Sequence, residues 1–269
     1  MTNSDAIEIV PNKKVRRKGI VPSKKIMSQL GKTNAAFGLI EEGDKILVGL
    51  SGGKDSLTLI HAMREQQRRA PFNFEFIAVT VGYGMGENFD YLAAHCKEND
   101  IQHIVYDTKI YETAQEKIRK NSSFCSFFSR MRRGSLYSVA EKEGCNKLAL
   151  GHHLDDAAES YFMNMIYNGQ MRALAPKYKA GNGLIVIRPL IQMRERQLLA
   201  FVKDNNLEAI GDEACPAMRF DVKAPHARAT MKAMLKGMEK EYPDIFVSIN
   251  AAFGNISEES FFDPERFAL

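Results

Sequence analysis

The chain has 269 residues, of which 45% are hydrophobic and 26% charged, with four Cys, no Trp and a formal net charge of +4. These proportions exclude a disordered, collagen-like or disulfide-stapled chain, and a chain of this length can bury roughly three quarters of the surface that it exposes when unfolded. One large α/β domain or two small ones are therefore both feasible.

Membrane insertion and secretion are not expected. No run approaches the roughly 20 apolar residues of a membrane span, and the N-terminal segment lacks the apolar centre of a secretory signal. The four Cys are widely spaced and form neither a disulfide framework nor a zinc-binding pair. The sequence therefore predicts a cytoplasmic protein with no membrane partner.

The net charge conceals two basic stretches. Residues 11–32 carry eight cations and residues 117–133 carry six, with no acidic residue in either stretch, so the rest of the chain has a net charge of −10. Lys and Arg that neutralise phosphates provide the sequence-independent part of nucleic-acid affinity, so the two stretches suggest a polyanionic partner, with solvated charge runs or a disordered arm as an equal alternative. The candidate contacts are Lys13, Lys14, Arg16, Arg17, Arg130, Arg132 and Arg133.

Five short apolar runs are typical of buried parallel strands, which carry nearly continuous apolar residues. They are Lys45–Leu50, Glu75–Val81, Gln102–Tyr106, Lys147–Leu150 and Leu184–Pro189.

Helical patterns separate and follow these runs. The clearest is Asp155–Asn168, whose apolar residues recur at helical spacing and which Gly169 ends. Another follows Ser51–Ser56 and runs to Pro71, a third ends at Gly144, and two more cover Arg194–Asn205 and Ala227–Glu241.

The alternation of strands and helices predicts an α/β fold with a doubly wound, mainly parallel five-stranded sheet of Rossmann-like type, whose ligands lie at the carboxyl ends of the strands. The expected organisation is a basic N-terminal arm and helix over residues 1–35, an α/β domain over 36–192 and a helical C-terminal extension over 193–269. The loop Gly82–Gly86 after the second strand is expected to be flexible and to face the substrate.

A phosphate-binding loop is the strongest motif. Directly after the first strand come Ser51, Gly52, Gly53, Lys54, Asp55 and Ser56, followed by an amphipathic helix. The glycines allow backbone N–H groups to approach phosphate oxygens, the helix N-terminus adds its positive dipole end, and the Ser and Lys side chains add donors. The spacing is not that of a Walker A loop, because Asp follows the Lys where Ser or Thr is required.

This hexapeptide resembles the SGGxDS signature of the PP-loop ATP pyrophosphatases. The resemblance implies a PP-loop fold that binds ATP and Mg²⁺ and cleaves ATP between its α and β phosphates, adenylating a carbonyl oxygen from which a nucleophile then displaces AMP. It further implies that the six loop residues hold the departing pyrophosphate, and that Lys54 and Asp55 act in catalysis, with Asp55 helping to place Mg²⁺.

A second motif, Gly151–Asp156, follows the fourth strand and opens a helix. Two carboxylates at a helix start are often only caps, but this segment and the phosphate loop both follow predicted parallel strands, so they are expected to face one crevice. Together with Arg130–Gly134 and Asn164–Gly169, the motif resembles the tRNA 2-thiocytidine synthetase branch of the PP-loop enzymes, with similarity from about Ile40 to Tyr242.

The resemblance to this branch implies tRNA thiolation at the 2-position of a cytidine. It implies that His152, His153, Asp155 and Asp156 line the ATP site, with Asp156 a Mg²⁺ ligand, and that the basic stretches contact tRNA. The expected partners are tRNA and a sulfur donor such as a cysteine desulfurase, and a homodimer is left open.

The chain departs from this branch at its cysteines. The branch places a Cys-x-x-Cys pair before the Arg-Arg-Gly segment and uses a third Cys downstream to hold an iron–sulfur cluster, a [4Fe-4S] cofactor. Here Cys125 takes the first place, Phe128 takes the second, and Cys215 is the downstream match. Because a phenyl ring cannot replace a thiolate, only two of three ligands are present.

Three interpretations follow. In the first, Cys125 and Cys215 are catalytic: one carries persulfide sulfur and the other releases it by forming a disulfide. In the second, a cluster is retained with a ligand from elsewhere. In the third, the enzyme makes a non-thiolated product or is a nucleic-acid-binding module without sulfur chemistry.

Overall fold

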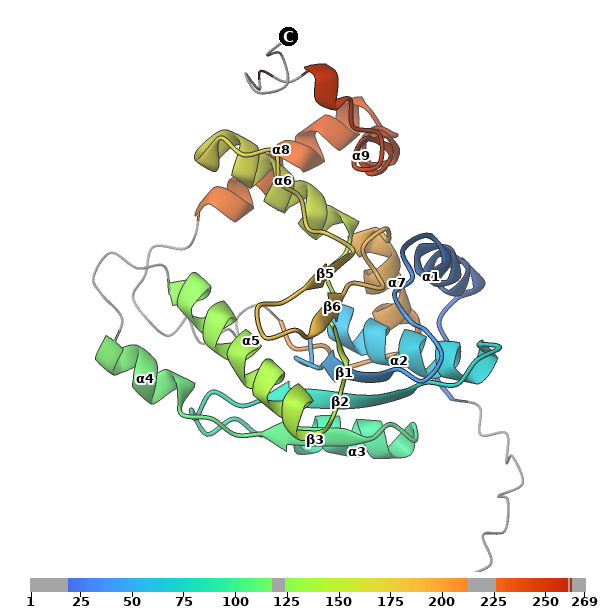
Figure 1. Cartoon of the computed structure of the whole chain (residues 1–269), viewed down its shortest axis with the longest axis vertical. Coiled ribbons are helices and arrows are strands. Elements are labelled where there is room, and N and C mark those ends of the chain that lie inside the picture. The colour runs from blue at the N-terminus through green and yellow to red at the C-terminus, as the bar shows by residue number, and fades with distance from the viewer. Residues whose placement is uncertain (1–18, 118–123, 212–225, 261, 263–269) are drawn as a thin grey trace, which may run out of the picture.

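The structure is a computed structural model that describes residues 19–117, 124–211, 226–260 and 262. Its strands are β1 (Lys45–Gly49), β2 (Glu75–Val81), β3 (His103–Tyr106), β4 (Lys147–Ala149), β5 (Lys177–Lys179) and β6 (Ile185–Ile187). They form a six-stranded sheet with the order β3-β2-β1-β4-β6-β5 (Figure 1). All neighbouring strands pair in parallel except β5, which runs antiparallel to β6.

The five predicted strands are all present, and the predicted doubly wound α/β fold is confirmed. The predicted strand number was wrong by one, because β5 joins the sheet at its edge. Its sequence, Lys-Tyr-Lys, has no apolar run, and it pairs only with β6. A three-residue edge strand of this kind carries no periodic signal that a sequence pattern can detect.

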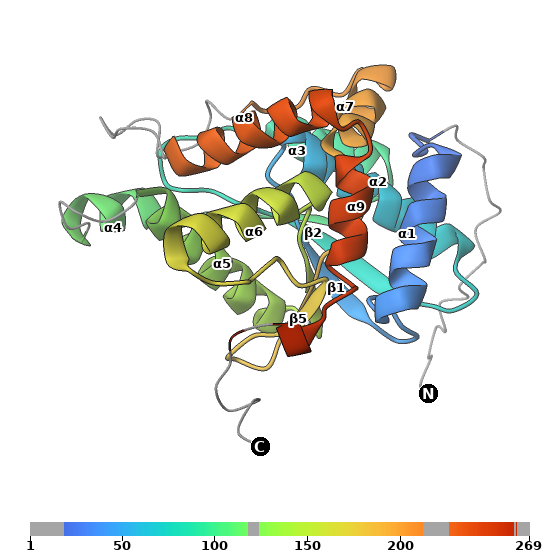
Figure 2. The same ribbon diagram turned by 90° about the horizontal axis from the view of Figure 1, so that it is seen from above.

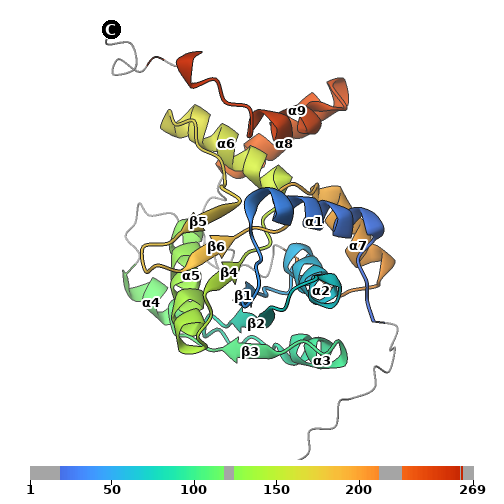
Figure 3. The same cartoon turned by 45° about the vertical axis from the view of Figure 1, so that its right-hand side comes forward.

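The helices are α1 (Lys24–Phe37), α2 (Lys54–Arg69), α3 (Asp90–Glu98), α4 (Ile110–Lys117), α5 (Phe124–Lys142), α6 (Leu154–Asn168), α7 (Glu195–Asp204), α8 (His226–Glu241) and α9 (Ile245–Ala252), with a short 3-10 helix at Glu258–Ser260. Helices α1, α2, α3 and α7 contribute to the apolar core on one face of the sheet, and α4 and α5 to the core on the other face (Figure 3).

Helices α6, α8 and α9 pack together around a third, smaller core that includes Leu154, Leu235 and Phe246. Seen from above, α8 and α9 lie beside α6 over the end of the sheet (Figure 2). Helix α7 instead packs against α2, and its Leu198 and Phe201 belong to the main core. The segment after residue 193 is therefore divided between the α/β layers and the small α-helical cluster.

The chain order places the end of β1 at a junction in the sheet. From β1 the chain builds outward through β2 to β3, then returns to add β4 on the other side of β1. In a doubly wound sheet, ligands bind outside the carboxyl ends of the strands where the order reverses in this way. The turns after β1 and β4 are therefore where a site is expected.

Across the described ranges, none of the helices combines the length and the apolar character needed to cross a bilayer.

Candidate functional site

The predicted phosphate loop forms the turn between β1 and α2. Gly52 has a φ of +81°, a left-handed conformation that favours glycine, and α2 begins at Lys54 with Gly53 as its N-cap. No side chain caps the helix, although the Gly53 amide lies 3.4 Å from the Ser51 hydroxyl. The Ser56 hydroxyl accepts from the Ser51 amide at 3.1 Å and donates to the Gly53 carbonyl at 2.9 Å. The loop is thus held in shape by its own serines, with the positive end of α2 open to an anion.

Two further segments close over Gly52. The Ile210 amide donates to the Gly52 carbonyl at 2.9 Å, and a Cβ on Gly52 would lie 2.5 Å from the Tyr91 hydroxyl oxygen. That hydroxyl is buried and has no hydrogen-bond partner among the described residues, and burial raises its pKa, so it remains a proton donor. Tyr91 therefore adds an unused donor beside the loop, which sequence reasoning did not identify.

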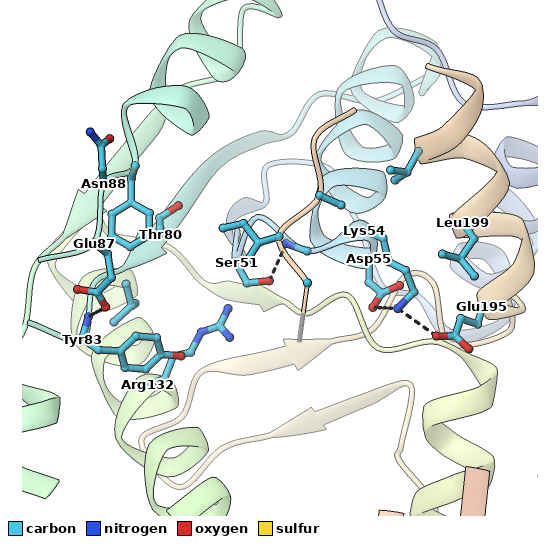
Figure 4. Close-up of a pocket in the computed structure, with 17 residues that line it drawn as sticks. Ser51, Lys54, Asp55, Thr80, Tyr83, Glu87, Asn88, Arg132, Glu195 and Leu199 are labelled. Carbon is cyan, nitrogen blue, oxygen red and sulfur yellow. Dashed lines mark hydrogen bonds and ion pairs between the residues drawn. The ribbon is translucent and has the colours of Figure 1, made fainter. Parts of the chain in front are cut away.

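Lys54 is held by carboxylates on both sides. Its Nζ lies 3.1 Å from Asp55 Oδ2 and 3.2 Å from Glu195 Oε1, and Glu195 also accepts from Lys232 of α8 at 3.0 Å (Figure 4). Burial opposes the charged form of Lys54, but the two carboxylates outweigh it and raise its pKa. The lysine is therefore a fixed cation at the start of α2.

The loop opens into a cavity of about 820 Å³. Lys54, Asp55 and Glu195 lie on one side of it, Tyr83 and Glu87 lie on the other, and Arg132 lies between them (Figure 4). The volume is within the roughly 300–1,000 Å³ range of small-molecule sites, so it can hold a nucleotide. Glu87 accepts from the backbone amides of Tyr83 and Met85 at 2.8 Å each, which orders the loop after β2 along this wall.

The second predicted motif forms the turn after β4. A Cβ on Gly151 would lie 3.1 Å from the backbone carbon of Asp55, so this turn packs directly against the phosphate loop. His153 then caps α6, because the Asp156 amide donates to its Nδ1 at 3.4 Å and the His153 amide donates to Asp156 Oδ2 at 3.0 Å. The two motifs that the sequence placed in one crevice are therefore adjacent.

His153 lies among three carboxylates. Its nearest ring nitrogens are 3.7 Å from Asp55 Oδ1, 3.6 Å from Asp155 Oδ2 and 3.5 Å from Asp156 Oδ2. Burial disfavours the imidazolium, but the three carboxylates outweigh it and raise the His153 pKa. The carboxylates therefore favour protonation of the ring more than its burial opposes it.

Asp155 is used for structure. Its carboxylate accepts from the Arg194 guanidinium at 3.1–3.2 Å and from the Glu195 amide at 2.7 Å. Burial opposes its ionisation, but His153, Arg194 and the Glu195 amide outweigh it and hold the Asp155 pKa below its usual range. This carboxylate, predicted to serve ATP, joins the starts of α6 and α7.

Asp55 and Asp156 are better placed to meet a cation. Asp55 Oδ1 is buried without a hydrogen-bond partner among the described residues, and burial raises the Asp55 pKa. Asp156 accepts from the Arg228 guanidinium at 3.2 Å and faces a second, smaller recess. Mg²⁺ is commonly held by one or two carboxylates together with substrate phosphates, so these two residues fit the predicted Mg²⁺.

The smaller recess has a volume of about 240 Å³ and lies between the turns after β1 and β4 on one side and α5 on the other. It shares Ser51, Asp55 and Arg132 with the larger cavity. It is lined by Gly49, Ser51, Asp55, Ser56, Ser129, Arg132, Arg133, Leu136, Leu150, Gly151, His152 and Asp156. His152, predicted to line the ATP site, thus faces this recess.

The predicted basic contacts fall into separate groups. Arg132 lines both cavities, Arg133 lines only the smaller one, and Arg130 is exposed and lines neither. The other four, Lys13, Lys14, Arg16 and Arg17, lie outside the described residues.

The cysteines do not supply the predicted cluster with three thiolates. Cys125 lies in α5, but its side chain is not described, and Cys215 lies outside the described residues. Cys96 and Cys145 are buried in different cores, and burial raises both thiol pKa values, that of Cys96 to about 12. A thiol that stays protonated is a poor cluster ligand.

Phe128 fills the place of the second cluster cysteine in the resembling branch. Its side chain is 3% exposed and makes edge-on ring contacts with Tyr83 and Phe127, at centroid distances of 5.8 and 5.9 Å. The described residues also contain no group of three His, Cys, Asp or Glu side chains that could hold a metal. The residues present therefore do not fit a cluster held by three cysteines.

Sequence reasoning missed the residues that come from α7 and α8. Arg194 and Glu195 contact the two motifs from α7 or its N-cap, and Arg228 contacts Asp156 from α8. Lys232 of α8 acts indirectly, because it binds Glu195. The hydrogen bonds from Arg194 to Asp155 and from Arg228 to Asp156 span 39 and 72 positions of the sequence. No local sequence pattern identifies contacts at such distances.

We expect Gly52→Ala to destabilise the protein by about 1–3 kcal/mol, because a side chain must adopt a left-handed backbone against Tyr91 and Ile210. Gly53→Ala is the matched control: its φ is −72° and its nearest contact would be 3.6 Å, so its change should stay below about 1 kcal/mol. Urea unfolding of both variants measures the difference, and equal losses would contradict the strained turn.

The chain is similar in sequence to several named proteins and similar in fold to a solved structure. The tRNA-cytidine(32) 2-sulfurtransferase of Geobacter metallireducens is 41% identical over 244 residues, covering 90% of this chain and 93% of that protein. A protein of the same name from Alcanivorax borkumensis is 36% identical over 248 residues, covering 91% and 85%.

Among solved structures, the U34-tRNA thiolase NcsA from Methanococcus maripaludis, which contains a 4Fe-4S cluster, is similar with a TM-score of 0.70 and 26% identity. The similarity covers 87% of this chain and 79% of that one. The PP-loop domain family matches residues 22–224. The chain therefore belongs to the PP-loop domain family and is similar, over most of its length, to the tRNA-cytidine 2-sulfurtransferases.

Proposed function

We propose that the protein is an ATP-dependent tRNA sulfurtransferase that adenylates the 2-oxygen of a cytidine and replaces it with sulfur, releasing pyrophosphate and then AMP. The observation that carries this proposal is the pairing of a phosphate loop with an adjoining second recess at the end of β1. The family and the names of the relatives support the same reaction.

The first step needs the pyrophosphate to leave as an anion. The N-terminus of α2 and Lys54 supply donors and positive charge that neutralise phosphate charge, and the Ser51 and Ser56 hydroxyls hold the loop in shape for them. Gly52 keeps the turn open, and the Tyr91 hydroxyl beside it is a further donor. These residues bind the β- and γ-phosphates in our proposal.

Asp55 and Asp156 would hold Mg²⁺, which when bound adds charge neutralisation at the phosphates. Asp55 is the stronger candidate, since its buried Oδ1 has no hydrogen-bond partner among the described residues. Lys54 at 3.1 Å keeps the other oxygen of this carboxylate oriented.

Arg132 lines both cavities, which supports our assignment of this residue to the point where the α-phosphate would meet the base oxygen. During adenylation the bond from this oxygen to phosphorus forms as the bond to pyrophosphate breaks, and negative charge builds on the phosphoryl oxygens. A guanidinium donates two hydrogen bonds in a fixed plane and suits that charge. We assign Arg132 a catalytic role in addition to tRNA attraction.

For sulfur transfer we propose the two-cysteine route. A donor such as a cysteine desulfurase places a sulfane sulfur on Cys125, and the terminal sulfur attacks C2 and expels AMP. The Cys215 thiolate then attacks the Cys125 sulfur, which leaves the thiolated base and a Cys125–Cys215 disulfide. The two thiolates supply the two electrons that reduce the sulfane sulfur, and a cellular dithiol restores them.

The remaining partners follow from this chemistry. The substrate is a tRNA, which Arg130, Arg133 and the N-terminal cations Lys13, Lys14, Arg16 and Arg17 would attract through its phosphates. We place the reaction in the cytoplasm, where tRNA and reducing dithiols are available, and a homodimer is compatible with it.

With ATP and tRNA, the protein should release pyrophosphate and AMP in equal amounts and form 2-thiocytidine when a persulfide donor is present. Asp55→Asn should lower pyrophosphate release by at least about 100-fold, because the Mg²⁺ that neutralises the phosphates would lose a carboxylate ligand. Nucleoside analysis and a pyrophosphate assay measure these products. ADP as the sole product would refute the mechanism, and a non-thiolated modified base would identify the alternative PP-loop enzyme.

Protein purified without oxygen should be colourless, hold far less than one iron per chain and still thiolate tRNA. Cys125→Ser and Cys215→Ser should abolish thiolation while leaving tRNA-dependent pyrophosphate release, and Cys145→Ala is the control that keeps thiolation because its thiol is buried in a core. Iron and sulfide analysis decides the first point. A brown protein with about four irons per chain would overturn the two-cysteine route.

Arg132→Gln and Arg130→Gln remove the same charge from α5, so they separate catalysis from attraction. Arg132→Gln should lower kcat by about 10²–10³-fold, as for loss of a donor to a charged transition state. Arg130→Gln should raise only the KM for tRNA and reduce the salt dependence of binding by about one charge. Steady-state kinetics at two salt concentrations tests both, and an equal effect on kcat would refute the assignment.

A further inference from the structure

The proposed binding of ATP in the larger cavity leaves the smaller recess without an assigned ligand. It lies at the junction of the sheet, between the ends of β1 and β4, and its volume of about 240 Å³ is below the range of roughly 300–1,000 Å³ that drug-sized ligands need. It is thus too small for a nucleotide and large enough for one planar ring. The inference below rests on the proposed function.

Two glycines shape this recess. A Cβ on Gly49 would lie 3.4 Å from Leu136 Cδ1 and 3.5 Å from Leu150 Cδ2, so both leucines close over the bare backbone of β1. Gly151 brings the turn after β4 against the backbone of Asp55. The result is a small recess with an apolar patch at Leu136 and Leu150 and otherwise polar walls, which suits a flat ring with polar edges.

His152 offers a donor at this rim. The Arg188 Nε donates to its Nδ1 at 3.3 Å, so the neutral ring carries its hydrogen on Nε2. In the part of the chain that the structure describes, no residue hydrogen-bonds to Nε2. Burial and the nearby cations Arg188, Arg228 and Arg133 outweigh the Asp156 carboxylate and lower the His152 pKa to about 4, which favours the neutral ring.

We propose that the recess receives the single pyrimidine base that the enzyme modifies, lying against Leu136 and Leu150, with His152 Nε2 as the hydrogen-bond donor to N3 of that base. The base must leave its stack to enter, as enzymes that act on a base require. Arg132 and Asp55, which line both cavities, then lie beside the point where the base oxygen meets the α-phosphate of ATP.

This placement gives His152 a role in the second step. When sulfur adds to C2 of the adenylated base, the electron pair of the C2=N3 bond moves onto N3, and it returns when AMP leaves. A fixed N–H donor aimed at N3 stabilises that charge where it develops. Ser129, which also lines the recess, follows Cys125 by four residues, about one helical turn, so the base lies near the segment that carries the proposed sulfur.

Ser129→Trp tests occupancy by filling the recess with an indole ring, and Ser129→Ala is its matched control. Ser129 does not line the larger cavity, so ATP affinity should stay within about twofold while tRNA-dependent pyrophosphate release falls by at least about 100-fold. The alanine variant should behave as the wild type. Normal thiolation by a folded Ser129→Trp protein would overturn the proposal.

His152→Leu and His152→Gln test the donor, since the glutamine amide can place an N–H near the position of Nε2. His152→Leu should still release pyrophosphate, accumulate adenylated tRNA and lose AMP release by about 10²–10³-fold, and His152→Gln should recover at least about tenfold of that loss. Equal losses of pyrophosphate and AMP in both variants would overturn the role at N3.

A photocrosslink keeps the test independent of variants that fail to fold. A tRNA carrying 5-iodocytidine at the modified position should crosslink within residues 129–136 or 150–152, as mapped by mass spectrometry. A crosslink confined to other segments would overturn the placement of the base. If the wild type makes no pyrophosphate with any tRNA, the proposed function itself fails, which separates the two outcomes.

Discussion

The carboxylate of Asp155 joins the parts of this molecule that the chain keeps far apart. It accepts hydrogen bonds from the Arg194 guanidinium and the Glu195 amide, so the N-terminus of α7 is held against the N-terminus of α6. Arg194 extends the joint, because it also pairs with Glu239 of α8 and lies 3.4 Å over the ring of Phe246 of α9. Removing one partner of such a buried pair typically costs about 3–5 kcal/mol. Through Glu195, the same joint sets the position of Lys54.

The site has two compartments because glycines let two turns approach one another. Gly52 allows the phosphate loop to close under Tyr91 and Ile210, and Gly151 allows the turn after β4 to press against Asp55. Between them lie the residues common to both cavities, Ser51, Asp55 and Arg132. A reaction that joins a phosphate to a base needs the two groups held next to each other in the right orientation. Two adjoining cavities with shared lining residues suit that requirement.

Phe128 stands where the resembling branch has a cysteine, and its side chain packs inside the protein. Its ring is buried against Tyr83, and Tyr83 lines the larger cavity, so the position that holds a cluster ligand in the resembling branch here supports the nucleotide side of the site. The sulfur chemistry is consequently left to Cys125 and Cys215 in our proposal, and α5 carries both Cys125 and Arg132 along the two cavities.

The sequence by itself determined the α/β alternation, the phosphate loop and the turn at Gly151–Asp156, because glycine, helix-start and apolar patterns are local and follow directly from backbone geometry. Only the tertiary structure decided that Asp155 binds Arg194, that His152 faces the smaller recess and that Arg132 lies in both cavities. It alone showed β5 as well. These features depend on contacts between distant segments, and such contacts leave no periodic mark in one sequence.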